Sequence, residues 1–187
     1  MRVVEEGASA LEVRAAEADA LVTAVVGMSV GIRTADCVPV LVGDARSGAV
    51  AAVHAGWRGA VAGVLNEALT TLCARVSTFP ADLLVAIGPH IRVDAFEIGE
   101  EVAVQLEKAA GPGFEDVVRR GDQKPHGDLA VLLRSQLRTL GVPTSSVDDV
   151  GRCTYSDQDH FFSYRREPGE KGRQLSWIQS CANRLGP

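Results

Sequence analysis

Residues 34–59, TADCVPVLVGDARSGAVAAVHAGWRG, constrain the fold more than any other stretch of this sequence. Two short apolar runs, VPVLV and AVAAV, flank the polar segment 44–48. This is the pattern of a β-hairpin whose loop is longer than two residues. Both faces of the hairpin are apolar, as in sheets that are covered by helices. We therefore expect a hairpin that is buried on both sides.

The hairpin carries a cysteine near its start and a histidine near its end. If Gly43 lies opposite Gly48, then Cys37 lies opposite His54, and opposed residues share a face with Cβ atoms about 4.5–5.5 Å apart. A thiolate and an imidazole at that separation can share one metal ion or one proton. Cysteine and histidine are also found as ordinary buried residues, so the pattern alone leaves both interpretations open.

The segment after His54 predicts an anion site beside this pair. Gly56 and Gly59 lie at a strand-to-helix junction, where glycine lets the backbone approach a ligand and the helix start offers free N–H groups. Arg58 adds a fork of donors that suits phosphate or carboxylate. Further along, FFSYRR places Arg165 behind aromatic residues, where it could line a pocket and bind a nucleotide or phosphate. A solvated surface turn is the alternative for that motif.

The remaining pattern predicts one α/β (α+β) domain over residues 1–187, with a mixed sheet covered by helices. Asp128 has the position of an N-cap for the last helix. We expect strands near residues 1–5, 18–23, 28–34, 83–87, 147–151, 153–155 and 174–180, and helices at 60–76, 96–111 and 129–140.

Composition limits the partners and the location. A net charge of −5 argues against nucleic acid and anionic membranes, which attract basic surfaces. No apolar run is long enough to span a bilayer, and the first residues lack the order of a secretory signal, so we expect a cytoplasmic protein. The four cysteines are dispersed and are expected to be free thiols. The sequence leaves the oligomeric state undefined.

Several segments together resemble the YfiH/YlmD family, also called the multicopper polyphenol oxidase (laccase) family, which includes mammalian FAMIN. They are TADCVPVL, AAVHAGWRG, IGPHI followed by FEIGEEV, the Asp128-Leu129 helix start, RCTY, and FFSYRR with GR downstream. The resemblance covers nearly the whole chain. It implies a YfiH-like fold and a zinc-dependent purine nucleoside phosphorylase acting on adenosine, inosine or guanosine with phosphate. Adenosine deaminase and methylthioadenosine phosphorylase activities are also associated with the family.

The resemblance assigns two of the three zinc ligands to Cys37 and His54. The third is a histidine in a Gln-Val-His-Gly-like motif, which we expect upstream of residue 1, so that the chain is N-terminally truncated relative to the family. A catalytic zinc normally has three protein ligands, so Cys37 and His54 alone should bind metal weakly unless His90, His126, His160 or a neighbouring chain completes the site. Four histidines are too few for several copper centres, which argues against multicopper oxidation.

In the resulting hypothesis, phosphate attacks C1′ of the ribose while Arg58 and the backbone of residues 56–59 hold the oxyanion. Zinc would polarise water or substrate, and adenosine deamination fits the same site. Asp36 lies next to Cys37 but on the opposite face of an ideal strand, so we expect it at most to support a ligand. Two alternatives stay open: a metal-free hydrolase or amidase with Cys37 as nucleophile and His54 as base, and a non-catalytic module that binds a nucleoside or a protein.

Overall fold

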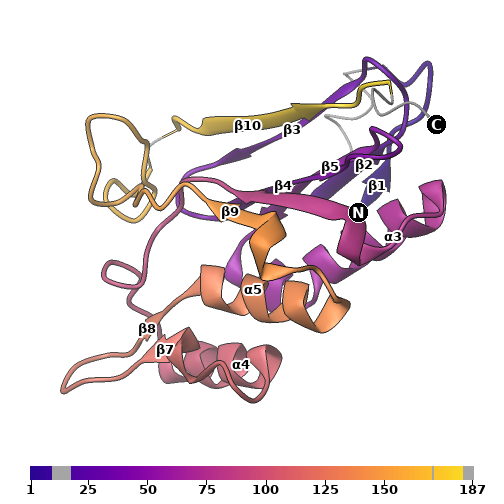
Figure 1. Ribbon diagram of the computed structural model, residues 1–187. Helices are drawn as coiled ribbons and strands as arrows, with labels where there is room; N and C mark the ends of the chain where they lie inside the picture. Colours follow the sequence, from indigo (N-terminus) through magenta and orange to yellow (C-terminus); the bar gives the residue numbers. More distant parts are fainter. Residues whose placement is uncertain (10–17, 170, 183–187) are drawn as a thin grey trace.

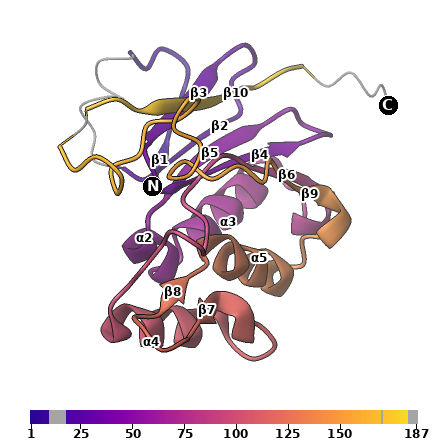
Figure 2. The same cartoon turned by 90° about the vertical axis from the view of Figure 1, so that its left-hand side faces the viewer.

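The computed structural model describes residues 1–9, 18–169 and 171–182. A mixed β-sheet lies at the centre, with a two-stranded ribbon on one face and helices on the other (Figure 1). The ribbon pairs β3 (Ser29–Thr34) with β10 (Gln174–Gln179) in antiparallel orientation. Figure 2 shows the same layers from the side, with α4 (Glu100–Ala110) outermost below α5 (Leu129–Leu140).

The six strands of the sheet confirm the central position of the hairpin. In spatial order the strands are β1 (Arg2–Val3), β2 (Ala20–Thr23), β5 (Val50–Ala55), β4 (Val38–Asp44), β6 (Leu83–Ile87) and β9 (Val147–Asp149). The hairpin pairs β4 with β5 in antiparallel orientation, and its neighbours β2 and β6 are also antiparallel to the hairpin strands that they contact. The outermost pairs, β1 with β2 and β6 with β9, are parallel.

The register of the hairpin differs by two residues from the expected one. Gly43 lies opposite Val50 and not opposite Gly48. Gly48 has a φ of 73°, a left-handed conformation that strands do not use, so it belongs to the turn. Asp44 widens that turn, because its carboxylate accepts hydrogen bonds from the Ser47 backbone N–H (3.0 Å) and from the Ser47 hydroxyl (2.5 Å). The expected register counted Gly48 as a strand residue and was wrong for that reason.

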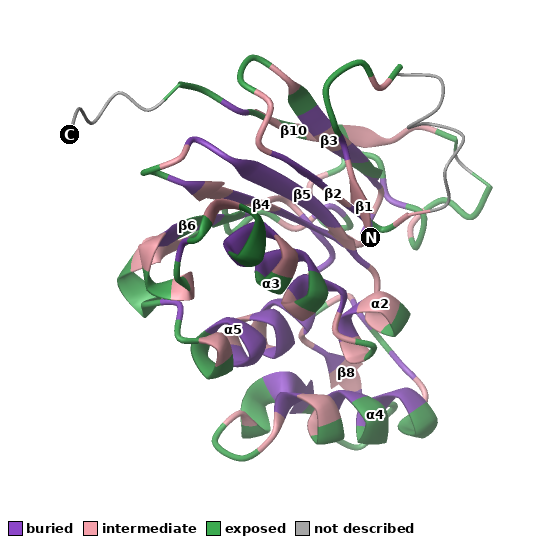
Figure 3. Cartoon of the chain, turned by 90° about the vertical axis from the view of Figure 1, so that its right-hand side faces the viewer, coloured by how far each residue is buried: buried purple, intermediate pink, exposed green. Residues whose placement is uncertain are grey.

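Both faces of the hairpin are buried, as expected, but only one is covered by helices (Figure 3). Side chains alternate along each strand. Val40 and Val53 point into the main core, which α3 and α5 complete. Leu41 and Ala52 point the other way and pack under Val30 and neighbouring residues of the ribbon. The second cover is therefore a pair of strands, which pattern alone did not distinguish from a helix.

The helices follow the predicted segments with changed ends. The segment 60–76 contains part of α2 (Trp57–Val61) and all of α3 (Val64–Val76), separated at Gly63, whose φ is 81°. The next helix, α4 (Glu100–Ala110), begins four residues later than expected. The Asp128 carboxylate caps α5 (Leu129–Leu140) by accepting from the Val131 N–H at 3.0 Å, which confirms the predicted N-cap.

The remaining elements are short. The expected strand at residues 153–155 is absent from the described structure, where Cys153 forms a single bridge with His90. Within the described residues, no helix has both the length and the apolar character that a bilayer crossing requires. The short elements are η1 (Pro80–Asp82), η2 (Glu115–Val117), η3 (Thr144–Ser146), β7 (Val118–Arg119) and β8 (His126–Gly127).

Candidate functional site

The structure brings Cys37 and His54 together at one end of the hairpin. His54 lies opposite Pro39, so Cys37 is its diagonal neighbour, one step before β4 begins. A register shift of two residues keeps side chains on the same face, because they alternate with a period of two. A Cβ placed on Gly56 would lie 3.2 Å from the Cys37 Sγ and 3.8 Å from the His54 Cε1. The two side chains therefore converge on Gly56, which must stay small.

Asp19 orients the histidine. Its carboxylate lies 2.8 Å from the His54 Nδ1, and its backbone carbonyl accepts the His54 N–H at 2.7 Å. The pKa of His54 is raised to about 9, chiefly by a hydrogen bond to Cys37 and further by Asp19, although burial opposes the charge. The ring is thus held between the Cys37 sulfur on one side and the Asp19 carboxylate on the other. Asp19 carries no motif of its own, and sequence reasoning missed it.

Cys37 and His54 open into a cavity of about 320 Å³ between the hairpin and the loop of residues 151–169, here called the cavity loop. Arg165 of the FFSYRR motif lines this cavity. Its guanidinium lies 5.4 Å from the centre of the Phe96 ring and donates to the Glu97 carbonyl at 2.9 Å. The described lining residues are Arg33, Thr34, Ala35, Asp36, Cys37, His54, Ile91, Phe96, Tyr164, Arg165 and Arg173.

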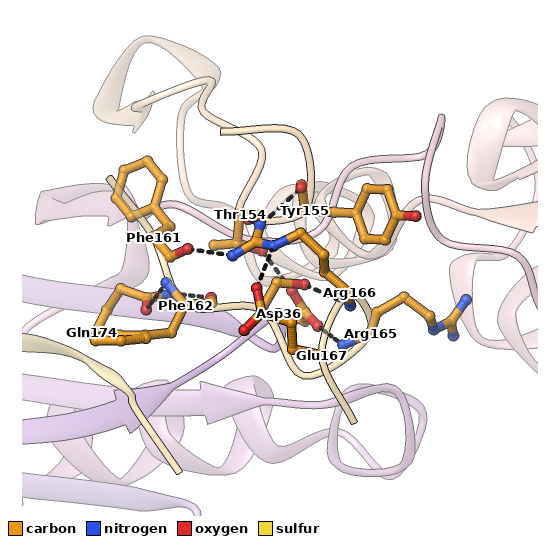
Figure 4. Close-up of polar contacts among 10 residues, drawn as sticks. Asp36, Thr154, Tyr155, Phe161, Phe162, Arg165, Arg166, Glu167 and Gln174 are labelled. Carbon is orange, nitrogen blue, oxygen red and sulfur yellow. Dashed lines mark hydrogen bonds and ion pairs between the residues drawn. The ribbon is translucent and has the colours of Figure 1, made fainter. Parts of the chain in front are cut away.

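Asp36 fastens the cavity loop to the hairpin (Figure 4). Its φ of 89° takes the backbone out of the strand path just before Cys37. The buried carboxylate accepts from the Thr154 hydroxyl at 2.7 Å and from the Arg165 backbone N–H at 2.6 Å. Arg166 completes the loop, since its guanidinium donates to the carbonyls of Thr154, Tyr155 and Phe161, so it is a structural residue.

Comparisons with known proteins identify the family of this chain. The family model "Multi-copper polyphenol oxidoreductase laccase" matches residues 1–181. The chain belongs to this family. It is 42% identical to a purine nucleoside phosphorylase of Bacteroides thetaiotaomicron over 164 residues, which cover 86% of this chain and 60% of that protein. It is 36% identical to adenosine deaminase RL5 of an unknown prokaryotic organism over 183 residues, which cover 94% of this chain and 69% of that protein.

A solved member of the family confirms the fold. The crystal structure of YlmD from Geobacillus stearothermophilus superposes with a TM-score of 0.82 and 32% identity, covering 87% of this chain and 61% of that one. The chain therefore spans about three fifths of the length of the Bacteroides relative and of YlmD. The mixed α/β fold expected from the sequence is the fold of the YfiH/YlmD family.

The other residues of the predicted anion site lie apart from the cavity in this family member. Arg58 is exposed, with its guanidinium 4.4 Å from the centre of the Trp57 ring, and it is absent from the described lining of the cavity. Gly59 lines a neighbouring hollow together with Asp19. The structure thus brings Cys37, His54 and Arg165 to one cavity, with Gly56 beside the thiol. Arg58 is absent from the described lining, and Gly59 lines the hollow beside Asp19.

The donor set of the site meets part of what zinc requires. A thiol and an imidazole are ordinary zinc ligands, and a metal-binding histidine commonly gives its other nitrogen to a carboxylate, as His54 does with Asp19. Over residues 1–9, 18–169 and 171–182, no three His, Cys, Asp or Glu side chains are placed to hold a metal together. His90 is fully buried, with its Nδ1 2.8 Å from the Gly88 carbonyl oxygen. The described residues fit two of the three ligands of a catalytic zinc.

Proposed function

We propose that this chain carries the site of a purine nucleoside phosphorylase, which also deaminates adenosine and accepts methylthioadenosine, with zinc bound by Cys37 and His54. The observation that carries the proposal is the convergence of the Cys37 thiol and the His54 ring, with the ring oriented by Asp19. Relatives named purine nucleoside phosphorylase and adenosine deaminase support it.

The chain's own residues account for substrate positioning. Phe96 and Tyr164 give the cavity aromatic surfaces suited to a purine and a ribose. In phosphorolysis, a phosphate oxygen bonds to C1′, and the C1′–N9 bond breaks with its electron pair on the purine, which takes up a proton. In deamination, water replaces the amino group at C6 and ammonia leaves. Zinc supplies a Lewis acid for either reaction when it is bound.

The experiment combines metal analysis with product analysis on the same purified chain. After zinc loading, adenosine or inosine with phosphate should yield free base and ribose 1-phosphate, and adenosine without phosphate should yield inosine. Cys37→Ser should lose both zinc and turnover. Cys181→Ser is the matched control, because Cys181 is an exposed free thiol in the tail. A preparation with stoichiometric zinc and no turnover would refute the proposal for this chain.

A second function has a specific observation in its favour. Cys37, His54 and Asp19 stand in the order of a nucleophile, a base and an orienting carboxylate, as in metal-free cysteine hydrolases. In that case iodoacetamide should alkylate Cys37 much faster than Cys181, and zinc should not protect it. If neither turnover nor selective alkylation is found, the non-catalytic binding module is the remaining explanation, and saturable nucleoside binding tests it.

A further inference from the structure

Three arginines line the cavity that holds Cys37 and His54. Arg33 extends from the end of β3, Arg165 from the cavity loop, and Arg173 from the residue before β10. Of the described residues lining the cavity, Asp36 alone carries a carboxylate. In a chain whose net charge is −5, this is a local excess of positive charge. Converging cations in a concave site raise the local concentration of an anionic ligand.

Asp36 does not neutralise this charge through direct pairing. Both of its carboxylate oxygens are already occupied, one by the Thr154 hydroxyl and the other by the Arg165 backbone N–H. Figure 4 shows the backbone of Arg165 at Asp36 and its side chain extending away from that carboxylate. The carboxylate therefore serves the loop and does not pair with the Arg165 guanidinium.

Two of the arginines have free donors. Arg165 is held in one orientation by the Glu97 carbonyl and the Phe96 ring, and its other guanidinium donors make no hydrogen bond within the described residues. Arg33 is exposed, and its guanidinium makes neither a hydrogen bond nor an ion pair with any described residue. A guanidinium that is already oriented beside one that is unengaged suits a tetrahedral oxyanion, which accepts several N–H donors at once.

We propose that Arg33 and Arg165 bind a phosphate group in this cavity, with Arg33 as the contact that determines phosphate affinity. The proposal rests on the proposed function, in which phosphate is the second substrate of phosphorolysis. It moves the phosphate contact away from Arg58, which lies on Trp57 outside the described cavity lining. Deamination needs no phosphate. The two reactions therefore share Cys37 and His54 but differ in their need for Arg33.

The test compares Arg33→Gln with Arg46→Gln. Arg46 is an exposed arginine in the loop at the opposite end of the hairpin, so it controls for the loss of a surface charge. Losing one charged hydrogen bond should raise the KM for phosphate about tenfold to a hundredfold in Arg33→Gln. In Arg33→Gln, the kcat/KM for adenosine deamination should fall by a smaller factor than the KM for phosphate rises, and Arg46→Gln should resemble the wild type in both reactions.

A binding measurement keeps this proposal separate from the activity. Inorganic phosphate and AMP are each titrated against the thermal midpoint, because a ligand of the folded state raises it. A phosphate-dependent rise that Arg33→Gln abolishes supports a free phosphate site, even if the wild type shows no turnover and the proposed function fails. A rise with AMP alone, also lost in the variant, supports a site for a nucleotide phosphate. If phosphate and AMP shift the thermal midpoints of Arg33→Gln and Arg46→Gln equally, the proposal is overturned. A KM for phosphate that changes in Arg58→Gln but not in Arg33→Gln would also overturn it.

Discussion

Replacing Asp36 with asparagine tests how firmly the cavity loop is held. Asparagine keeps the volume and tolerates the left-handed backbone at this position, whose φ is 89°. It presents one acceptor oxygen to two donors, the Thr154 hydroxyl and the Arg165 N–H. One bond to a buried charge is lost at about 1.5–3 kcal/mol, and the new amide hydrogens face a donor. We expect a loss near the upper end, about 3 kcal/mol.

For a chain of this size, such a loss lowers the thermal midpoint by roughly 6–12 °C. The matched control is Asp122→Asn, at an exposed aspartate in the loop before β8, which should shift the midpoint by less than about 1 °C. Trypsin adds a local readout, since Arg166, which is partly buried and held by carbonyls of the loop, becomes accessible when the loop opens. The role assigned to Asp36 is refuted if Asp36→Asn has the same thermal midpoint as Asp122→Asn and trypsin cleaves its loop no faster than that of the wild type.

Three further predictions concern single positions. Burial disfavours the ionised form of Asp44, but hydrogen bonds from Ser47 and its neighbours outweigh this and lower the pKa of Asp44 below 3.8. The ionised carboxylate therefore stabilises the fold at neutral pH, and this stabilisation is lost as the pH falls below that value. Urea unfolding should therefore show Asp44→Asn less stable than the wild type at pH 7, with a gap that shrinks toward pH 3; a pH-independent gap would contradict this. Gly63→Ala should cost about 1 kcal/mol in the same assay because of the left-handed φ, and Gly63→Asn less; equal losses would point to packing instead. Gly56→Ala should displace Cys37 and lower zinc occupancy and turnover about tenfold with unchanged circular dichroism, whereas full activity would show that the thiol need not lie there.

The strand pattern was the most informative part of the sequence. Continuous and alternating apolar runs located the central hairpin and β6, because burial of those residues is what makes the sheet stable. The ribbon of β3 and β10 on the second face of the sheet was not predicted. A ribbon and a helix both pack against apolar residues of the strand beneath, so the sequence does not distinguish them. The register error came from Gly48, because its left-handed conformation cannot be deduced from the sequence Gly48-Ala49-Val50.

The candidate site was predictable to the extent that it is local. Cys37, His54 and Gly56 lie in or next to one hairpin. An error of two residues in register left Cys37 and His54 on the same face, because side chains alternate with a period of two. Asp19 could not be foreseen, because its position beside His54 depends on the pairing of β2 with β5. Arg33 was missed for a similar reason. It reaches the cavity only because β3 leaves the sheet and pairs with β10.

That pairing has a consequence for synthesis on the ribosome. Thr34 lies opposite Gln174, so β3 cannot find its partner until residues 174–179 have emerged, about 140 residues later. The nascent chain must therefore carry an uncovered apolar sheet face and an unprotected Cys37 while the middle of the protein is being translated. Chaperone contacts and thiol oxidation should both concentrate in that interval, and a stop codon before residue 174 should leave a product that aggregates instead of folding.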